Sequence, residues 1–297
     1  MKGIILAGGS GTRLYPLTLS VSKQMLPVYD KPMIYYPLST LLLAGIKDIL
    51  IIATPQHMAG FEQLLGDGNQ LGISLSYKVQ EEPRGLAEAY ILAEDFLSGD
   101  SSMLILGDNI FHAANLQGVL RKAVAENVGA TVFAYPVDDP GSFGIIEFDA
   151  LGRAVSIEEK PAEPKSRYAI PGLYICDAHA PEIAAQVKPS ARGELEITSV
   201  LQAYLDQDRL SVVPFGRGTI WLDTGSYANL LDAANFVQLI QKRSGSMVSA
   251  IEEVAYNESY INAEQLRRLA EPLIKTSYGD YLLKLVAADR QEANMGA

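Results

Sequence analysis

The sequence predicts an α/β protein with a mixed, mainly parallel central sheet and helices on both faces. Two observations carry this prediction. The 297 residues are 48% hydrophobic and 20% charged, which is an ordinary globular balance. Short β-branched runs also alternate with longer stretches in which apolar residues recur at helical spacing. Because helices join consecutive strands in such a pattern, those strands pair in parallel and bind ligands beyond their carboxyl ends.

The first half of the chain contains the clearest alternation. Strands are predicted at residues 2–7, 48–54, 74–80, 103–106 and 130–136. Helices are predicted between them at residues 33–44, 58–65, 86–97 and 116–126. This order implies consecutive βαβ units.

After residue 140 the pattern changes. Residues 143–149 and 154–159 predict a hairpin, residues 167–176 predict one further strand, and helices and a strand follow. From Tyr227 onward the chain is mostly helical, with helices predicted at 227–242, 263–269 and 278–286. We therefore expect a small C-terminal helical region after the sheet.

Composition excludes several classes of protein. The 24 Lys and Arg residues face 35 Asp and Glu residues, a net charge of −11, which argues against a nucleic-acid polymer as partner. The acidic net charge does not exclude small phosphorylated ligands, because residues 1–34 have four cationic side chains and one carboxylate and could attract such a ligand locally. The single cysteine, Cys176, permits no internal disulfide and indicates a cytoplasmic location. No apolar run approaches the roughly 20 residues of a membrane span, and the N-terminus does not resemble a secretory signal.

A glycine-rich loop follows the first predicted strand. It reads Ala-Gly-Gly-Ser-Gly-Thr-Arg-Leu over residues 7–14, and Lys23 follows nine residues after Leu14. Glycines let the backbone approach a ligand closely, and Arg and Lys are typical phosphate partners. A tight turn with two exposed cations is the alternative, but the added cations favour phosphate binding. Neither the dinucleotide fingerprint nor the P-loop fits, because Leu14 replaces the third glycine and Gly-Lys-Ser/Thr is missing.

Two aspartates each follow an apolar run. Asp108 comes after residues 103–106, and Asp223 comes after residues 220–222. One Asp in that position most often caps a turn, but two beside a phosphate loop predict ligands for Mg²⁺. The triplet Asp223-Thr224-Gly225 also occurs in aspartic proteases. Because the chain has one such triplet and an α/β pattern, that alternative carries little weight.

Several motifs together resemble the sugar-1-phosphate nucleotidyltransferases. They are Gly-Ser-Gly-Thr-Arg with Lys-Gln-Met-Leu-Pro-Val after it, Leu-Gly-Asp-Asn at 106–109, Ile-Glu-Glu-Lys-Pro at 157–161, Arg-Gly-Glu-Leu-Glu-Ile-Thr at 192–198 and Trp-Leu-Asp-Thr-Gly at 221–225. The stretch Tyr-Asp-Lys-Pro-Met-Ile-Tyr-Tyr-Pro at 29–37 is similar to the glucose-1-phosphate thymidylyltransferase branch. The resemblance implies a Rossmann-like nucleotidyltransferase domain over residues 1–226, with residues 227–297 as the C-terminal helical region and oligomer contact.

The resemblance also implies the activity. Such an enzyme joins dTTP and glucose 1-phosphate into dTDP-glucose and pyrophosphate, uses Mg²⁺ and forms a homotetramer. Alternatives are a UTP-dependent uridylyltransferase, an enzyme for another sugar 1-phosphate and, with less weight, a nucleotide-sugar sensor without catalysis. The sensor is disfavoured because binding alone does not need both the cations and the two aspartates. Thymine and uracil share the edge that a Gln would recognise, so a Gln at the base site predicts one of these two pyrimidines without distinguishing between them.

Site roles are assigned by the same resemblance. The expected catalytic residues are Arg13, Lys23, Asp108, Lys160 and Asp223, with Asp108 and Asp223 as the metal ligands. The expected nucleotide site adds Leu6, Gly8, Gly9, Gly11, Thr12, Gln24, Gln80 and Gly85. The expected sugar-phosphate site contains Asn109, Gly144, Glu159, Lys160, Ile170 and Tyr174. The segment 110–115 departs from the family pattern, which puts feedback regulation by nucleotide sugars in question, and Phe143 and Pro171 are milder departures.

Overall fold

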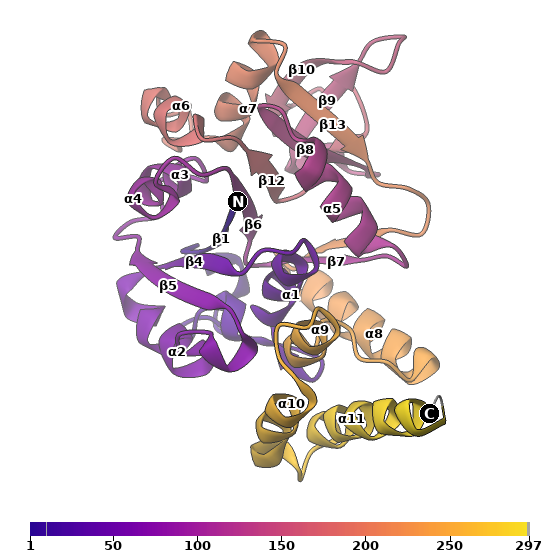
Figure 1. Cartoon of the computed structure of the whole chain (residues 1–297). Coiled ribbons are helices and arrows are strands. Elements are labelled where there is room, and N and C mark those ends of the chain that lie inside the picture. The colour runs from indigo at the N-terminus through magenta and orange to yellow at the C-terminus, as the bar shows by residue number, and fades with distance from the viewer. Residues whose placement is uncertain (10, 296–297) are drawn as a thin grey trace.

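The central sheet of the computed structural model has ten strands, and the structure describes residues 1–9 and 11–295. Its strand order is β10-β9-β11-β8-β12-β6-β1-β4-β5, with β13 paired to β8. Following the pairings, β5, β4, β1, β6, β8, β13 and β9 run in one direction, and β12, β11 and β10 run in the other. The predicted mixed, mainly parallel sheet is therefore confirmed (Figure 1).

The N-terminal half is a parallel α/β unit. Its strands are β1 (Lys2–Ala7), β4 (Asp48–Ala53), β5 (Ser74–Val79) and β6 (Ser102–Leu106). Its helices are α1 (Tyr35–Leu43), α2 (Pro55–Leu65), α3 (Glu88–Leu92) and α4 (Glu94–Leu97). The helix expected over residues 86–97 is thus two short helices that meet at Ala93. A two-stranded ribbon, β2 (Pro27–Val28) with β3 (Lys31–Pro32), leads into α1.

The second half adds the antiparallel strands. It contains α5 (Leu116–Glu126), β8 (Ala130–Pro136), β9 (Gly144–Phe148), β10 (Ala154–Glu159), α6 (Ala180–Gln186), α7 (Ile197–Asp206) and β13 (Leu210–Pro214). The β9–β10 hairpin is as expected. The single strand expected at 167–176 is wrong: β11 (Tyr168–Ala169) and β12 (Leu173–Cys176) are separate. Pro171, which has no N–H to donate, lies in the break between them.

A separate two-stranded ribbon stands beside the main sheet and was not predicted. It pairs β7 (Asn109–His112) with β14 (Ile220–Asp223) in antiparallel fashion, and Asp223 lies opposite Asn109. The ribbon therefore brings two segments more than 100 residues apart to the carboxyl end of β6. Both aspartates predicted as metal ligands lie at this place.

The C-terminal helices pack beneath the parallel half of the sheet (Figure 1). They are α8 (Tyr227–Ser244), α9 (Ile251–Asn257), α10 (Ala263–Ala270) and α11 (Ser277–Met295). Ala233 and Val237 of α8 pack with Val28, Met33 and Tyr36. Buried residues of α9, α10 and α11 join the apolar cluster that also contains α1.

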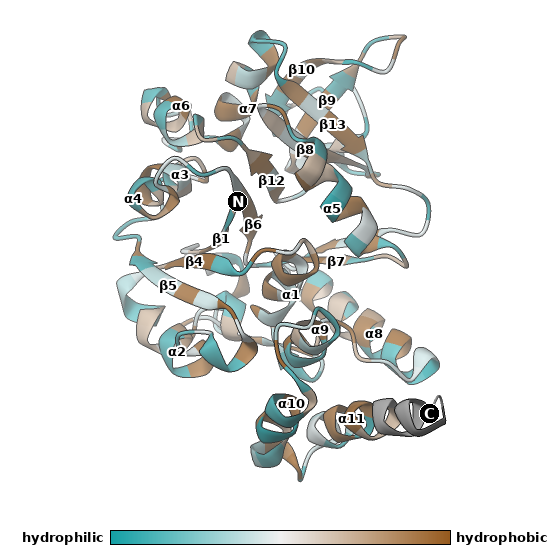
Figure 2. Cartoon of the chain, viewed as in Figure 1, coloured by the Kyte–Doolittle hydropathy of each residue, from teal (hydrophilic) through white to brown (hydrophobic). Residues whose placement is uncertain are grey.

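Alternating residues of the strands form an apolar core on each face of the sheet. Ile5, Ile49 and Ile105 pack with α1, α2 and α5, whereas Ile4, Leu50 and Leu104 pack with α3, α6 and α7. Figure 2 shows hydrophobic residues along β12 near the centre of the sheet, whereas α10 at the periphery carries mainly hydrophilic residues. Among the described residues, no helix is both long enough and apolar enough to cross a bilayer.

Candidate active site

A pocket of about 190 Å³ lies at the carboxyl ends of β1 and β6. Its lining comes from the glycine-rich loop, from the short helix Lys23–Met25, from the end of β6 and from the segment after β14. The lining residues are Gly9, Gly11, Thr12, Arg13, Leu14, Lys23, Gln24, Asp108 and Gly225. The structure therefore brings together most of the predicted phosphate-binding residues.

The glycine-rich loop has a backbone conformation that suits glycine. Gly11 has a φ of 60°, in the left-handed region, and its carbonyl accepts a hydrogen bond of 2.8 Å from the Thr18 hydroxyl. Arg13 is exposed to solvent and lines the pocket. A Cβ at Gly225 would lie 3.1 Å from the Arg13 guanidinium and 3.1 Å from an Asp223 carboxylate oxygen, so Arg13 and Asp223 are neighbours.

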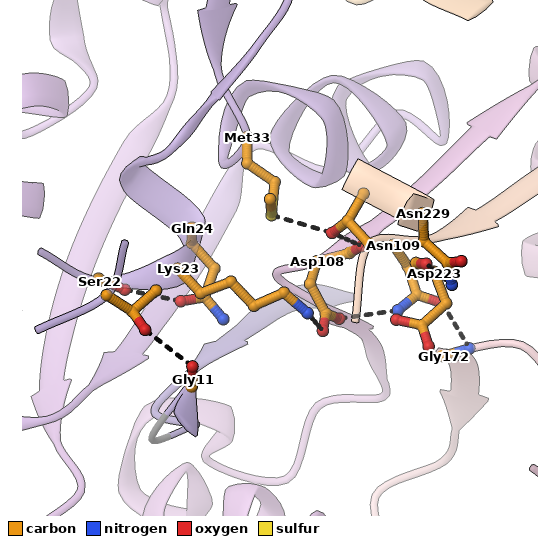
Figure 3. Close-up of polar contacts among 12 residues, drawn as sticks. Gly11, Ser22, Lys23, Gln24, Met33, Asp108, Asn109, Gly172, Asp223 and Asn229 are labelled. Atoms are coloured by element: carbon orange, nitrogen blue, oxygen red, sulfur yellow. Dashed lines mark hydrogen bonds and ion pairs between the residues drawn. The ribbon is translucent and has the colours of Figure 1, made fainter. Parts of the chain in front are cut away.

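Lys23 and Asp108 form an ion pair at the base of the pocket (Figure 3). The Lys23 ammonium lies 2.5 Å from Asp108 Oδ2, and the Lys23 side chain is only 7% exposed. Asn109 Nδ2 donates to the other Asp108 oxygen at 2.9 Å. The Thr224 hydroxyl donates to the Asp108 carbonyl at 2.9 Å, which ties the segment after β14 to the end of β6.

The two aspartates are electrostatically different. Burial alone would raise the pKa of Asp108, but the Lys23 ammonium and the Asn109 amide stabilise its charged form, so this pKa lies below its usual value. Burial and the Asp108 carboxylate raise the pKa of Asp223. The Lys23 and Arg13 cations act in the opposite direction, but the pKa of Asp223 remains above its usual value.

The donor set fits a magnesium ion. Mg²⁺ prefers oxygen ligands and commonly takes one or two protein carboxylates, with water and substrate phosphates completing its shell. Asp108 and Asp223 supply two such carboxylates beside the phosphate loop. No group of three or more His, Cys, Asp or Glu arranged to hold a metal occurs among the described residues, so an all-protein metal cage is not found there.

Asn109 is buried, and both polar atoms of its side chain form hydrogen bonds within the protein. Its Oδ1 accepts hydrogen bonds from the Gly172 backbone N–H at 3.1 Å and from Trp221 Nε1 at 2.6 Å. Its Nδ2 binds Asp108. These contacts connect the end of β6, the start of β12 and β14. The side chain predicted to contact the sugar phosphate thus orients Asp108 in this structure (Figure 3).

The other residues predicted for the sugar phosphate gather around β9 and β10. Gly144 pairs with Glu159, and its carbonyl accepts the Ile170 N–H at 2.8 Å. Burial, followed by the Glu196 carboxylate, raises the pKa of Glu159, although Lys160 and Arg192 oppose that shift. The Lys160 side chain is about half exposed, and its ammonium lies 4.0 Å from Glu159 Oε1. Tyr174 is buried on β12, where it pairs with Leu104 of β6, and its pKa is raised by burial and, to a smaller extent, by Glu159 and Asp108.

The remaining nucleotide-site residues lie around the pocket. Leu6 is buried in β1, and its carbonyl accepts the Gly107 N–H at 2.9 Å. Gln24 is buried and accepts from the Ser22 hydroxyl at 2.6 Å. Gln80 follows β5 and lies against Gly8, where a Cβ would be 1.9 Å from Gln80 Oε1. Gly85 has a φ of 122° and packs on the Leu195 backbone.

Sequence reasoning missed several residues that hold this arrangement. Trp221 donates to Asn109, and Arg192 contacts Glu159 at 3.3 Å and Glu196 at 2.9 Å. Glu88 is a buried carboxylate that binds Gln80 and Arg84. The i,i+4 spacing of Arg84 and Glu88 at the start of a predicted helix was a usable signal for an ion pair. No sequence signal indicated the contact between Glu88 and Gln80.

Comparisons with known proteins agree with this geometry. A family model described as "Nucleotidyl transferase" matches residues 2–239. A protein of Xanthomonas campestris pv. campestris named glucose-1-phosphate thymidylyltransferase is 57% identical over 96% of both chains. A Neisseria meningitidis protein of the same name is 54% identical over 96% of this chain and 99% of its own. A crystal structure of a candidate glucose-1-phosphate thymidylyltransferase from Bacillus anthracis, in complex with sucrose, has a TM-score of 0.74 and 41% identity over 80% of this chain and 94% of that one.

Proposed function

The chain belongs to the nucleotidyl transferase family, and we propose that it transfers a thymidylyl group from dTTP to glucose 1-phosphate, giving dTDP-glucose and pyrophosphate. The single observation on which the substrate assignment depends is the 57% identity to a glucose-1-phosphate thymidylyltransferase over 96% of both chains. The geometry supports the same chemistry independently. The pocket combines backbone N–H groups, two cations and a carboxylate, as the joining of two polyanions requires.

On the nucleotide side, the protein screens the charge of the triphosphate. The N–H groups of the glycine-rich loop and the Arg13 guanidinium would bind the phosphate oxygens. Lys23 would stabilise the negative charge that develops on the leaving pyrophosphate. Because Asp108 already holds the Lys23 ammonium inside the pocket, little reorganisation of this cation is needed.

Mg²⁺ would be held by Asp108 and Asp223, and it would neutralise charge on the transferring phosphate group. Asp108 is kept ionised by Lys23 and Asn109, which suits a metal ligand. Burial and the Asp108 carboxylate raise the pKa of Asp223, and a bound divalent cation would oppose both effects by stabilising the ionised carboxylate.

On the sugar side, Lys160 would orient the phosphate of glucose 1-phosphate, and Glu159 would accept hydrogen bonds from sugar hydroxyls. An oxygen of the sugar phosphate then attacks the α-phosphorus in line as the bond from that phosphorus to pyrophosphate breaks. The sugar phosphate is already an ionised nucleophile, so no covalent enzyme intermediate is required. Catalysis by these residues is positioning and electrostatic stabilisation.

The assembly and location are further parts of the proposal. We assign residues 1–226 to the catalytic domain and residues 227–297 to a C-terminal helical region that contributes to a homotetramer. Large apolar side chains on α8, namely Tyr227, Leu231 and Leu239, are at least half exposed and offer a surface for subunit contact. A buried, free Cys176 fits a cytoplasmic protein, and the net charge of −11 disfavours nucleic-acid polymers and anionic membranes as partners.

Release of pyrophosphate from a panel of substrates tests the proposal. We expect turnover with dTTP and glucose 1-phosphate in the presence of Mg²⁺, and loss of turnover after chelation. Preference for UTP or for another sugar 1-phosphate would overturn only the substrate assignment. No turnover with any pair would overturn the enzymatic proposal and favour a sensor.

A further inference from the structure

Gln80 is held in one orientation by Glu88. Gln80 is 2% exposed, and its Nε2 donates to Glu88 Oε2 at 2.7 Å. Its Oε1 points the other way, toward the glycine-rich loop, where it occupies the place that a Cβ at Gly8 would take. The amide therefore presents its oxygen to the side of the molecule where the nucleotide is proposed to bind.

The chemistry of Glu88 makes this orientation obligatory. Arg84 binds Glu88 Oε1 through Nε at 2.7 Å and Nη2 at 2.5 Å, and the Arg84 backbone N–H donates to Oε2 at 3.2 Å. An ionised carboxylate can only accept hydrogen bonds. If the Gln80 amide rotated by half a turn, its oxygen would face the Glu88 carboxylate, and two buried acceptors would oppose each other.

The segment that carries Glu88 is fixed in place. The Leu195 N–H donates to the Arg84 carbonyl at 2.7 Å, and the Ala87 N–H donates to the Leu195 carbonyl at 3.0 Å. Gly85 lies between these two contacts, with no room for a side chain because a Cβ would be 2.4 Å from the Leu195 oxygen. Glu88 is buried at the first residue of α3. Glu88 therefore cannot shift easily to follow a rotating amide.

A free Gln can recognise two kinds of pyrimidine. Thymine and uracil present an N3–H donor beside a carbonyl acceptor, whereas cytosine presents an N3 acceptor beside an amino donor. Because rotation of the amide exchanges donor and acceptor, an unrestrained Gln can match either edge. In the orientation seen here, Oε1 can accept from N3–H, and the second hydrogen of Nε2 remains for the base carbonyl.

We propose that Glu88 is a specificity-determining positioning residue: it fixes the Gln80 amide so that thymine or uracil is accepted and cytosine is excluded. The inference rests on the proposed function, because it takes Gln80 as the residue that contacts the base. According to this inference, Glu88 determines which base is accepted although it does not itself touch the nucleotide. Such discrimination works by penalising the wrong partner as well as by binding the right one.

The variant Glu88→Gln tests the inference. A Gln at 88 can donate or accept, so it can satisfy the Gln80 amide in either orientation. We expect kcat/KM for dCTP to rise relative to that for dTTP by roughly tenfold, mainly through a lower KM for dCTP. The KM for glucose 1-phosphate should not change. General damage to the fold would not improve the use of a second nucleotide, so this gain separates positioning from a merely structural role.

Matched controls make the outcome decisive. Glu82→Gln removes an exposed carboxylate from the same segment and should leave the dTTP-to-dCTP ratio unchanged. Glu88→Asp keeps an acceptor-only side chain and should keep the preference for dTTP. The inference is overturned if Glu88→Gln folds and uses dTTP with an unchanged ratio. It is also overturned if the unaltered enzyme uses dCTP as well as dTTP, a result that needs no variant. Failure of the unaltered enzyme to turn over dTTP would instead overturn the proposed function.

Discussion

The Lys23 ammonium lies 2.5 Å from the Asp108 carboxylate and is almost completely buried there. The pair holds the long lysine side chain in the phosphate pocket and lowers the pKa of Asp108. A cation and a carboxylate that are both needed for phosphate chemistry are thus positioned by each other. Changing either partner should therefore alter the other.

Asp108→Asn should abolish most of the turnover and leave the fold intact. The amide cannot replace a charged metal ligand, and it also leaves Lys23 without its counter-charge. We expect a loss of about 100-fold or more in kcat, of the size seen when a transition-state charge contact is removed. Pyrophosphate release measures kcat, and circular dichroism monitors the fold. Asp232→Asn, at an exposed position on α8, is the control. Activity of Asp108→Asn near that of the control would show that Asp108 is not the ligand.

Gly85→Ala should weaken nucleotide binding and stability together. Its φ of 122° is unfavourable for alanine, and the new Cβ would be 2.4 Å from the Leu195 oxygen. We expect unfolding free energy to fall by about 1–3 kcal/mol and the KM for dTTP to rise. Urea titration and steady-state kinetics measure the two effects.

Gly99→Ala is the matched control for this prediction. Gly99 also has a positive φ, of 82°, but no atom lies within 4 Å of its Cβ position. The control should show the cost of the backbone conformation alone. Equal losses in the two variants would mean that the contact with Leu195 is unimportant.

Local patterns predicted the parallel half of the fold and the phosphate loop. The apolar runs of β1 and β4 are buried on both faces of the sheet, so their sequences are nearly continuous hydrophobic stretches. Asp108 could be predicted because it lies just after β6, with only Gly107 between them. The short ribbon of β7 and β14 could not be predicted from local pattern, because its four-residue strands are stabilised by pairing across more than 100 residues.

The supporting contacts of the site were beyond the reach of sequence pattern for a similar reason. Asn109 was assigned to the sugar phosphate by resemblance, yet its side chain bonds to Asp108, Gly172 and Trp221. Nothing in the spacing of these residues indicates that they meet. The break between β11 and β12 was signalled by Pro171 and Gly172, but the apolar residues on either side predicted one continuous strand.

Lys31→Met should destabilise the contact between the β2–β3 ribbon and the C-terminal helices. Lys31 is buried, and its ammonium lies 2.5 Å from Asp30 Oδ1. The same ammonium makes cation–π contacts with the rings of Tyr36 and Tyr278. Its removal leaves Asp30 without a cation at a partly buried position. We expect a loss of about 3 kcal/mol in unfolding free energy, the cost of breaking a buried ion pair from one side.

Urea unfolding measures that loss. Lys275→Met, which changes an exposed lysine near the start of α11, serves as the control and should shift stability by less than about 0.5 kcal/mol. If both variants unfold at the same urea concentration, Lys31 does not hold the C-terminal helices in place.

Cys176 should make stability fall at alkaline pH. Burial raises the pKa of its thiol from 9.0 to about 12. In the unfolded chain the thiol ionises near pH 9, but in the folded protein it stays protonated. The contribution of the protonated Cys176 thiol to the free energy of unfolding is therefore complete below pH 9, and it is lost as pH rises from 9 toward 12. Between about pH 9 and pH 10.5, stability should fall by about 1–2 kcal/mol more in the unaltered protein than in Cys176→Ser, whose hydroxyl does not titrate there. Parallel curves for the two proteins in urea titrations would contradict this assignment.

Trp221→Phe should slow catalysis without unfolding the protein. The indole N–H donates to Asn109 Oδ1 at 2.6 Å, and the ring packs edge-on against Phe143 and Tyr135. Phenylalanine keeps much of that packing but leaves Asn109 with one donor fewer, which loosens the amide that orients Asp108. We expect kcat to fall by roughly tenfold with little change in the KM for either substrate, because the lost hydrogen bond acts on positioning. Phe143→Leu, which alters the packing and keeps the indole donor, should affect kcat less. A larger effect for Phe143→Leu would show that packing of the ring, and not its hydrogen bond to Asn109, positions Asp108.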